Sequence, residues 1–149
     1  MTTDTPSDPL LFTLLNEIGI IEQLARTRFE AAQEDGLKLA HFILLNHLMR
    51  LGDGKSPVAL ARAFQVTKGA ITNTMHRLEE RGLITITPDD VDGRGKRVWL
   101  TDAGRARRTA AVASLAPAFA DLGTVLSEAE IRTLLEPLSR LRKALDARR

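Results

Sequence analysis

The stretch from Ser56 to Gly104, SPVALARAFQVTKGAITNTMHRLEERGLITITPDDVDGRGKRVWLTDAG, decides the fold of this 149-residue chain. Ser56-Pro57 is typical of a helix start, and Thr67 can cap a second helix after a tight turn. Gly82 can end that helix, and beyond it the apolar period changes from 3.6 to 2. The expected elements are helices near 56–64 and 68–81 and strands at 83–87 and 96–100. Two helices joined by a turn and followed by a hairpin make a winged helix-turn-helix.

The second helix of this stretch has an apolar and a polar side. The apolar positions that can face a core are Ala70, Ile71, Met75 and Leu78. The polar and basic positions on the other side are Lys68, Thr72, Asn73, His76 and Arg77. Such a face can contact base edges and phosphates in the major groove of DNA. An ordinary amphipathic surface helix would show the same pattern, so this helix alone leaves both interpretations open.

The hairpin favours the DNA-binding interpretation. Its loop carries Arg94, Lys96 and Arg97, and an arginine on such a wing can reach a narrow minor groove. Residues 62–108 hold ten Lys or Arg and six Asp or Glu, a local charge of +4. The rest of the chain holds 11 basic and 13 acidic residues, a charge of −2. A basic middle third is expected of a protein that binds a polyanion.

Helices are expected on both sides of this region. Helical spacing of apolar residues predicts a helix at 9–33, a helix at 37–51 that is apolar all round and therefore buried, and a helix at 102–122. Pro117 should bend or break the third of these. A capping box at 127–130 opens a last helix with a leucine stripe, which Pro137 should kink. The fold class is mainly α with a small β-hairpin wing, in the order α-α-α-α-β-β-α-α.

Four segments, taken in this order, closely resemble the MarR (multiple antibiotic resistance regulator) family. They are SPVALA at 56–61, VTKGAIT at 66–72, RLEERGLI at 77–84, and DGR at 92–94 followed by VWLTDAG at 98–104. The resemblance implies one domain over 1–149, with a winged helix-turn-helix at 37–101 and dimerisation helices at 9–33 and 102–147. It also implies a homodimer on a pseudo-palindromic double-stranded DNA operator, and a repressor that a small aromatic or anionic effector releases.

The resemblance further assigns roles to single residues. Arg94 would enter the minor groove, with Asp92 as its partner within the wing, beside Lys96 and Arg97. The residues expected at the major groove and its flanking phosphates are Lys68, Thr72, Asn73, His76 and Arg77. Glycines flank Arg94 where further basic side chains often occur in the family, which predicts a more flexible wing that binds less tightly.

Other classes of function lack the residues that they need. The chain has no Cys, which removes disulfides, thiolate metal sites and thiol-based sensing and fits a reducing cytoplasm. His41 and His47 fall on opposite sides of a helix, and no nucleophile is paired with a base, so we expect no metal, no cofactor and no enzyme activity. No signal peptide or apolar run of membrane-spanning length is present, so a cytoplasmic protein is expected. The alternative is a winged helix that binds another protein and shows no salt-dependent DNA affinity.

Overall fold

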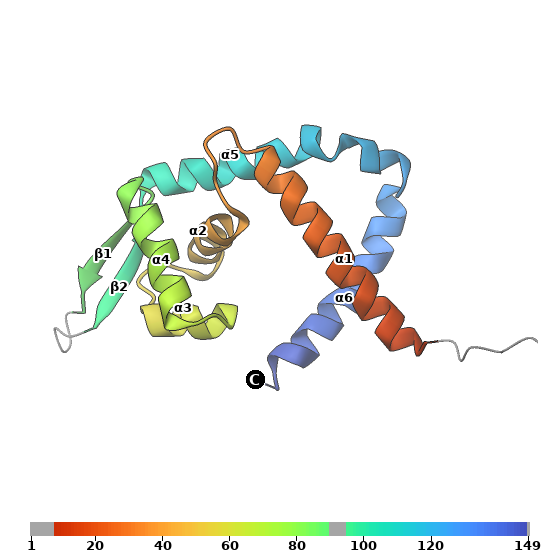
Figure 1. Cartoon of the computed structure of the whole chain (residues 1–149), viewed down its shortest axis with the longest axis horizontal. Helices are drawn as coiled ribbons and strands as arrows, with labels where there is room; N and C mark the ends of the chain where they lie inside the picture. The colour runs from red at the N-terminus through yellow and green to blue at the C-terminus, as the bar shows by residue number, and fades with distance from the viewer. Residues whose placement is uncertain (1–7, 90–94, 149) are drawn as a thin grey trace, which may run out of the picture. The chain divides into compact units, whose positions relative to one another are not determined.

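The computed structural model describes residues 8–89 and 95–148, and these divide between two compact units, 1–114 and 115–149. The elements are α1 (Leu10–Ala31), α2 (Leu39–Leu51), α3 (Pro57–Phe64), α4 (Lys68–Glu80), β1 (Ile84–Pro88), β2 (Lys96–Leu100), α5 (Asp102–Ala118), the 3-10 helix η1 (Ala120–Thr124) and α6 (Glu128–Asp146). Figure 1 labels the α-helices and the two strands. This order confirms the expected fold class. No helix in the described ranges is both long and apolar enough to cross a membrane.

The helix-turn-helix is built from the caps that the sequence predicted. The Ser56 hydroxyl accepts a hydrogen bond from the Ala59 N–H at 3.1 Å, and Pro57 occupies the first turn of α3. Between the helices, Gln65 adopts a left-handed conformation with φ of 51°. The Thr67 hydroxyl then accepts from the Ala70 N–H at 3.1 Å and starts α4. Each cap satisfies a backbone donor that has no partner within its helix.

The end of α4 is fixed by Gly82, which adopts a φ of 70°. Its N–H donates to the Glu79 carbonyl at 2.9 Å, and the Leu83 N–H donates to the Leu78 carbonyl at 3.0 Å. This pair of bonds is a Schellman motif, which stops a helix and turns the chain away from its axis. Leu78 and Leu83 are both buried, so the motif delivers the chain directly into β1 beside the core.

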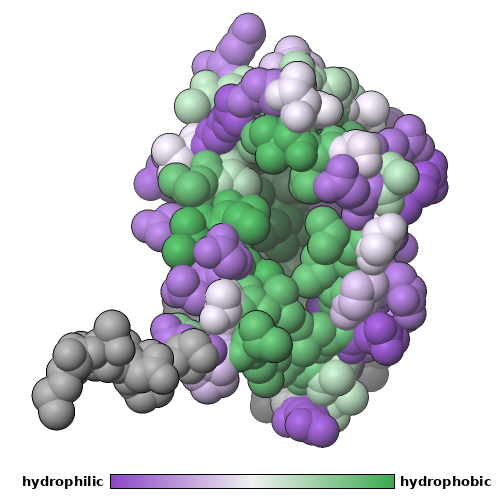
Figure 2. All heavy atoms as spheres, turned by 90° about the vertical axis from the view of Figure 1, so that its right-hand side faces the viewer, coloured by the Kyte–Doolittle hydropathy of each residue, from purple (hydrophilic) through white to green (hydrophobic). Residues whose placement is uncertain are grey.

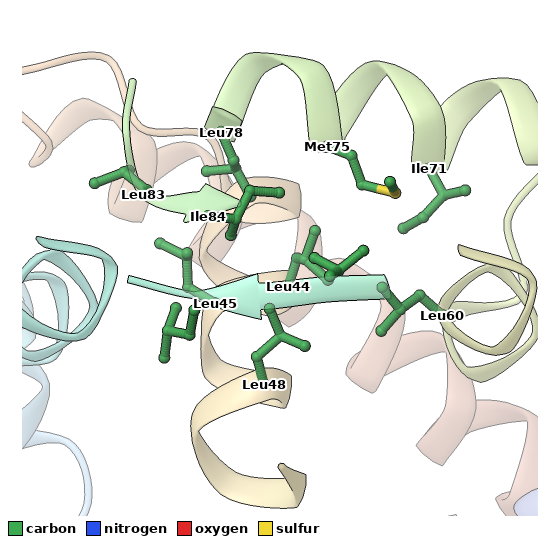
Figure 3. Packing of buried hydrophobic residues seen from close by; sticks show 11 residues of the cluster. Leu44, Leu45, Leu48, Leu60, Ile71, Met75, Leu78, Leu83 and Ile84 are labelled. Atoms are coloured by element: carbon green, nitrogen blue, oxygen red, sulfur yellow. The ribbon is translucent and has the colours of Figure 1, made fainter. Parts of the chain in front are cut away.

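One apolar cluster joins α2, α3, α4 and the hairpin (Figure 3). Its buried members are Leu44, Leu45, Leu48, Leu60, Ile71, Met75, Leu78, Leu83, Ile84, Val98 and Leu100. In the hairpin, Ile84 pairs with Leu100 and Ile86 with Val98, which directs one face of both strands into this cluster. The winged helix-turn-helix therefore has a core of its own.

The structure corrects several details of the sequence analysis. Helix α2 is buried on one side only, since Ile43 and Met49 are each 37% exposed. Ala70 is exposed and does not face the core. Helix α5 ends one residue after Pro117, which confirms the expected break, and the 3-10 helix η1 follows it. Pro137 lies inside α6, which is one continuous helix from Glu128 to Asp146.

The second unit, residues 115–149, contains the end of α5, η1 and α6. The expected capping box is present: the Ser127 hydroxyl accepts from the Glu130 N–H at 3.2 Å, and the Glu130 carboxylate accepts from the Ser127 N–H at 3.4 Å. Ion pairs one turn apart join Glu128 to Arg132 and Glu136 to Arg140 on its surface.

Helix α5 starts against the hairpin at a very close approach between Gly104 and Leu83. A Cβ placed on Gly104 would lie 2.1 Å from the Leu83 carbonyl oxygen and 2.8 Å from Leu100 Cδ1. The Leu83 carbonyl also accepts from the Thr101 N–H at 3.2 Å, and Gly104 is buried. Only glycine allows α5 to leave the hairpin at this distance.

We expect Gly104→Ala to lower the free energy of unfolding by about 2–3 kcal/mol, because the backbone of Leu83 must move to admit the methyl group. Gly69→Ala is the matched control, since that helical Cβ would meet nothing closer than 4.0 Å. Urea unfolding, followed by the fluorescence of Trp99, the only tryptophan, measures the free energy of unfolding of both variants. Equal stability of the two variants would contradict the close approach.

Candidate nucleic-acid interface

Helix α4 turns a polar face outward because its other face is held in the core. Ile71, Met75 and Leu78 are buried at 3%, 3% and 0% exposure, which confirms the inward side predicted for three of the four apolar positions. At 100° per residue, the side opposite these three carries Gly69, Asn73 and His76. The inner packing thus determines which side chains a partner can meet.

The structure places the five predicted recognition residues on this helix with unequal exposure. Lys68, Asn73, His76 and Arg77 are exposed, whereas Thr72 is half-buried. By helical geometry, Thr72 and Arg77 lie near opposite edges of the outward face, with Asn73 and His76 between them. Arg77 also lies near enough to His41 of α2 to lower the pKa of that imidazole. Asn73 and His76 therefore lie at the centre of the outward face, and Arg77 lies at its edge.

Of the four predicted wing residues, two can be placed. Asp92 and Arg94 lie outside the described residues. Lys96 begins β2 and is exposed. Arg97 is half-buried: its Nη1 donates to the Gly54 carbonyl at 2.8 Å, and its Nε lies 3.5 Å from the Asp89 carboxylate. Arg97 thus fastens the base of the wing to the loop before α3.

The loop before α3, residues 52–55, supports the base of the wing. The Gly54 N–H donates to the Val98 carbonyl, and the Val98 N–H donates to the Lys55 carbonyl, both at 2.9 Å. The ring of Trp99 covers Gly54, where a Cβ would come within 3.0 Å of Cη2. The Trp99 Nε1 donates to the Thr87 hydroxyl at 2.8 Å across the hairpin. In the sequence, the only signals for this contact were the single tryptophan and the Gly-Asp-Gly run at 52–54.

Asp53 in the same loop ties β2 to α5. Its carboxylate accepts from the Leu100 N–H at 2.9 Å and from Arg105 Nη2 at 3.0 Å. One carboxylate therefore holds the last residue of the wing and the first turn of the helix that follows. The position of the wing depends on residues that precede the helix-turn-helix in the sequence.

Both histidines of α2 have a pKa below the usual range. Burial is the main cause for each; nearby Arg81 and Arg77 further lower the pKa of His41, and Lys55 lowers that of His47. His47 also packs edge-on against Phe64, with ring centroids 5.0 Å apart. Within residues 8–89 and 95–148, no group of three His, Cys, Asp or Glu side chains could hold a metal ion. The two imidazoles are neutral at pH 7 and belong to the packing.

Comparisons with known proteins agree with this geometry. The family model for the MarR family matches residues 35–95. The transcriptional activatory protein BadR of Rhodopseudomonas palustris is 30% identical over 125 residues, which cover 83% of this chain and 70% of the relative. The chain belongs to the MarR family.

Solved structures of MarR and of another transcriptional regulator match almost the whole chain. A MarR mutant from E. coli complexed with operator DNA has a TM-score of 0.72 at 24% identity, covering 91% of this chain and 99% of the other. The regulator BldR from Sulfolobus solfataricus has a TM-score of 0.74 at 25% identity, covering 91% and 94%. A further crystal structure of MarR reaches 0.81 at 24% identity, with 99% and 97% covered. Family and fold are those of transcriptional regulators and not of enzymes.

Arg97 and Lys96 should respond differently to truncation, although they are neighbours on one strand. We expect Arg97→Ala to lower the free energy of unfolding by about 1 kcal/mol, because it removes a charged hydrogen bond to Gly54 from a partly exposed site. Lys96→Ala should leave the stability unchanged and weaken DNA binding at low salt. Urea unfolding and fluorescence anisotropy with labelled DNA test the pair. A stable Arg97→Ala with lower DNA affinity would show that Arg97 faces DNA instead.

Proposed function

We propose that this MarR-family regulator binds a specific double-stranded DNA operator through α4 and the wing. The observation that carries the proposal is the outward polar face of α4, with Asn73 and His76 at its centre and the basic Lys68 and Arg77 beside it. A core on the opposite side holds this face in place, and base edges can be read by side chains of these types. The structure of a related MarR with operator DNA supports the same use of the fold.

The proposed wing contact is made by Arg94 in the minor groove, supported by Asp92 within the wing and by Lys96. An arginine there responds to groove width and negative potential and not to the hydrogen-bonding pattern of single bases. Arg97 contributes by holding the base of the wing. The major-groove and minor-groove contacts should consequently differ in how they depend on sequence and salt.

A homodimer is proposed because large apolar side chains stand exposed on both terminal helices. In α1 these are Leu10, Leu11, Phe12, Leu14, Leu15, Ile20, Ile21 and Leu24, which are 43–88% exposed. In α6 they are Ile131, Leu134, Leu135, Leu138 and Leu145, which are 37–62% exposed. Figure 2 shows hydrophobic side chains at the surface of the chain. Apolar patches of this extent mark interaction surfaces, and a second copy of the chain can cover them symmetrically.

The direction of regulation is proposed to be repression that a small aromatic or anionic effector relieves, as the family resemblance implies. Activation is the second candidate, because the relative BadR is named a transcriptional activatory protein. Both use the same bound dimer and differ in where the operator lies relative to the promoter. Transcription in vitro from a template with the selected operator, with and without the protein, separates them.

DNA selection tests the central proposal. From a randomised library, the chain should enrich a pseudo-palindrome with half-sites about 10–10.5 base pairs apart. Asn73→Ala should cost roughly 1–3 kcal/mol on that site and relax preference at one or two positions. Arg94→Ala should weaken binding to most sequences and reduce the log-log salt slope by about one unit per subunit. A chain that enriches no sequence and shows no salt slope would instead be a protein-interaction module.

The dimer is tested by placing charge on its proposed interface. Leu14→Glu with Ile21→Glu puts two carboxylates one heptad apart on α1 and should give a folded monomer with much weaker operator binding. Asn16→Glu with Gln23→Glu is the matched control, since both positions are exposed and polar. Light scattering gives the mass of each variant. A dimer from the first pair, as stable as the control, would exclude α1 from the interface.

A further inference from the structure

A polar cluster joins the end of the recognition helix α4 to α5 through the loop between α1 and α2. Its centre is Asp35, which lies in that loop. Asp35 accepts two hydrogen bonds from Arg107 of α5, one from Nε and one from Nη2, each of 2.7 Å. It also pairs with Arg81, the C-cap residue directly after α4. One carboxylate thereby connects two arginines that lie 26 positions apart in the sequence, one directly after α4 and one in α5.

Gln33 extends the cluster into the interior. It is the one buried polar side chain in the part of the chain that the structure describes, at 6% exposure. Its Oε1 accepts from Arg107 at 2.9 Å, and its Nε2 donates to the Ser114 hydroxyl at 2.9 Å and to the Phe29 carbonyl at 3.2 Å. All of its polar atoms are satisfied, which is required of an amide placed out of water. Gln33 holds the Arg107 guanidinium in the orientation that meets Asp35.

The surroundings of Asp35 favour its charged form. Hydrogen bonds from Arg107 hold the pKa of the carboxyl well below its usual range, although its partial burial opposes them; the Leu37 N–H and Arg81 act in the same direction as Arg107. The carboxylate is ionised at any pH at which DNA binding is measured. Both arginines therefore stay attached to one fixed negative charge.

The polar cluster lies outside the apolar cluster of the winged helix-turn-helix. The cluster that includes Ile71 and Leu78 is built from α2, α3, α4 and the hairpin and, among the described residues, contains none from α1 or α5. Helix α5 meets that cluster at Gly104, which lies against Leu83 and Leu100. Arg107, one turn farther along α5, is held by Asp35, so the polar contacts give α5 a second attachment, which leads to the end of α4.

We propose that Asp35 is a positioning residue that fixes the recognition helix α4 relative to α5 through Arg81 and Arg107. The inference rests on the proposed function, because in a dimer joined by its terminal helices the angle between α4 and α5 determines the separation of the two recognition helices. Asp35 itself would not contact DNA. It would instead determine which spacing between the two half-sites the dimer can bind.

Asp35→Asn separates this role from simple electrostatics. The substitution removes a negative charge, so long-range attraction alone would raise affinity for DNA. We expect the opposite on the selected operator: about five- to tenfold weaker binding. Binding to a random duplex should stay equal or become slightly tighter. Glu22→Gln is the matched control, since it removes a carboxylate from an exposed ion pair with Arg26 on α1, and it should not weaken operator binding.

The preference of the dimer for one half-site spacing is the property that a merely stabilising ion pair would not affect. Operators with the half-sites one base pair closer, at the selected spacing and one base pair farther apart are compared for the wild type, Asp35→Asn and Glu22→Gln. The wild type and Glu22→Gln should discriminate strongly among the three, and Asp35→Asn should discriminate at least about threefold less. Arg107→Lys, which keeps the charge but cannot make the paired hydrogen bonds, should behave as Asp35→Asn does.

The outcomes are distinct. If Asp35→Asn and Arg107→Lys both keep the wild-type affinity and spacing preference, the positioning role is wrong while the proposed function stands. If one of the two variants fails to fold, as Trp99 fluorescence would show, the other variant alone tests the positioning role. If the wild type itself selects no operator, the proposed function fails, and this inference fails with it.

Discussion

Burial of Ile71, Met75 and Leu78 is the constraint on which the rest of the interface depends. A helix advances 100° per residue, so three fixed inward side chains determine the direction of every other side chain on α4. Val98 and Ile84 of the hairpin enter the same cluster. The recognition helix and the base of the wing are thus held by one core, and a change in its packing would alter both.

The wing needs a second support, because a two-stranded hairpin is marginal alone. The loop before α3 supplies it: backbone hydrogen bonds join this loop to Val98, the Trp99 ring covers Gly54, and the Arg97 guanidinium meets the Gly54 carbonyl. Asp53 then connects the end of β2 to Arg105 of α5. Polar contacts at the base of the hairpin complement the apolar core beneath it.

The features that sequence analysis predicted are those determined by near neighbours along the chain. The caps at Ser56 and Thr67, the stop at Gly82 and the alternation of the hairpin each involve residues a few positions apart, and the structure contains all of them. The pairing of Arg97 with Gly54 and of Asp35 with Arg107 spans 43 and 72 positions. Periodicity carries no information about such distant polar pairs, and Arg97 was consequently assigned only to the wing surface.

The two kinds of contact in this chain respond differently to a change in orientation. Close-packed apolar side chains lose many contacts when they separate, so the core under α4 resists deformation. The pairs at Asp35 are directional and partly open to solvent, with 40% of that side chain exposed, and water can replace a protein partner there at small net cost. A change at Asp35 is therefore expected to alter the attachment of α5 to the end of α4 while the core under α4 stays intact. The shape of the outward face of α4 depends on the apolar core, and its orientation relative to α5 depends also on these polar pairs.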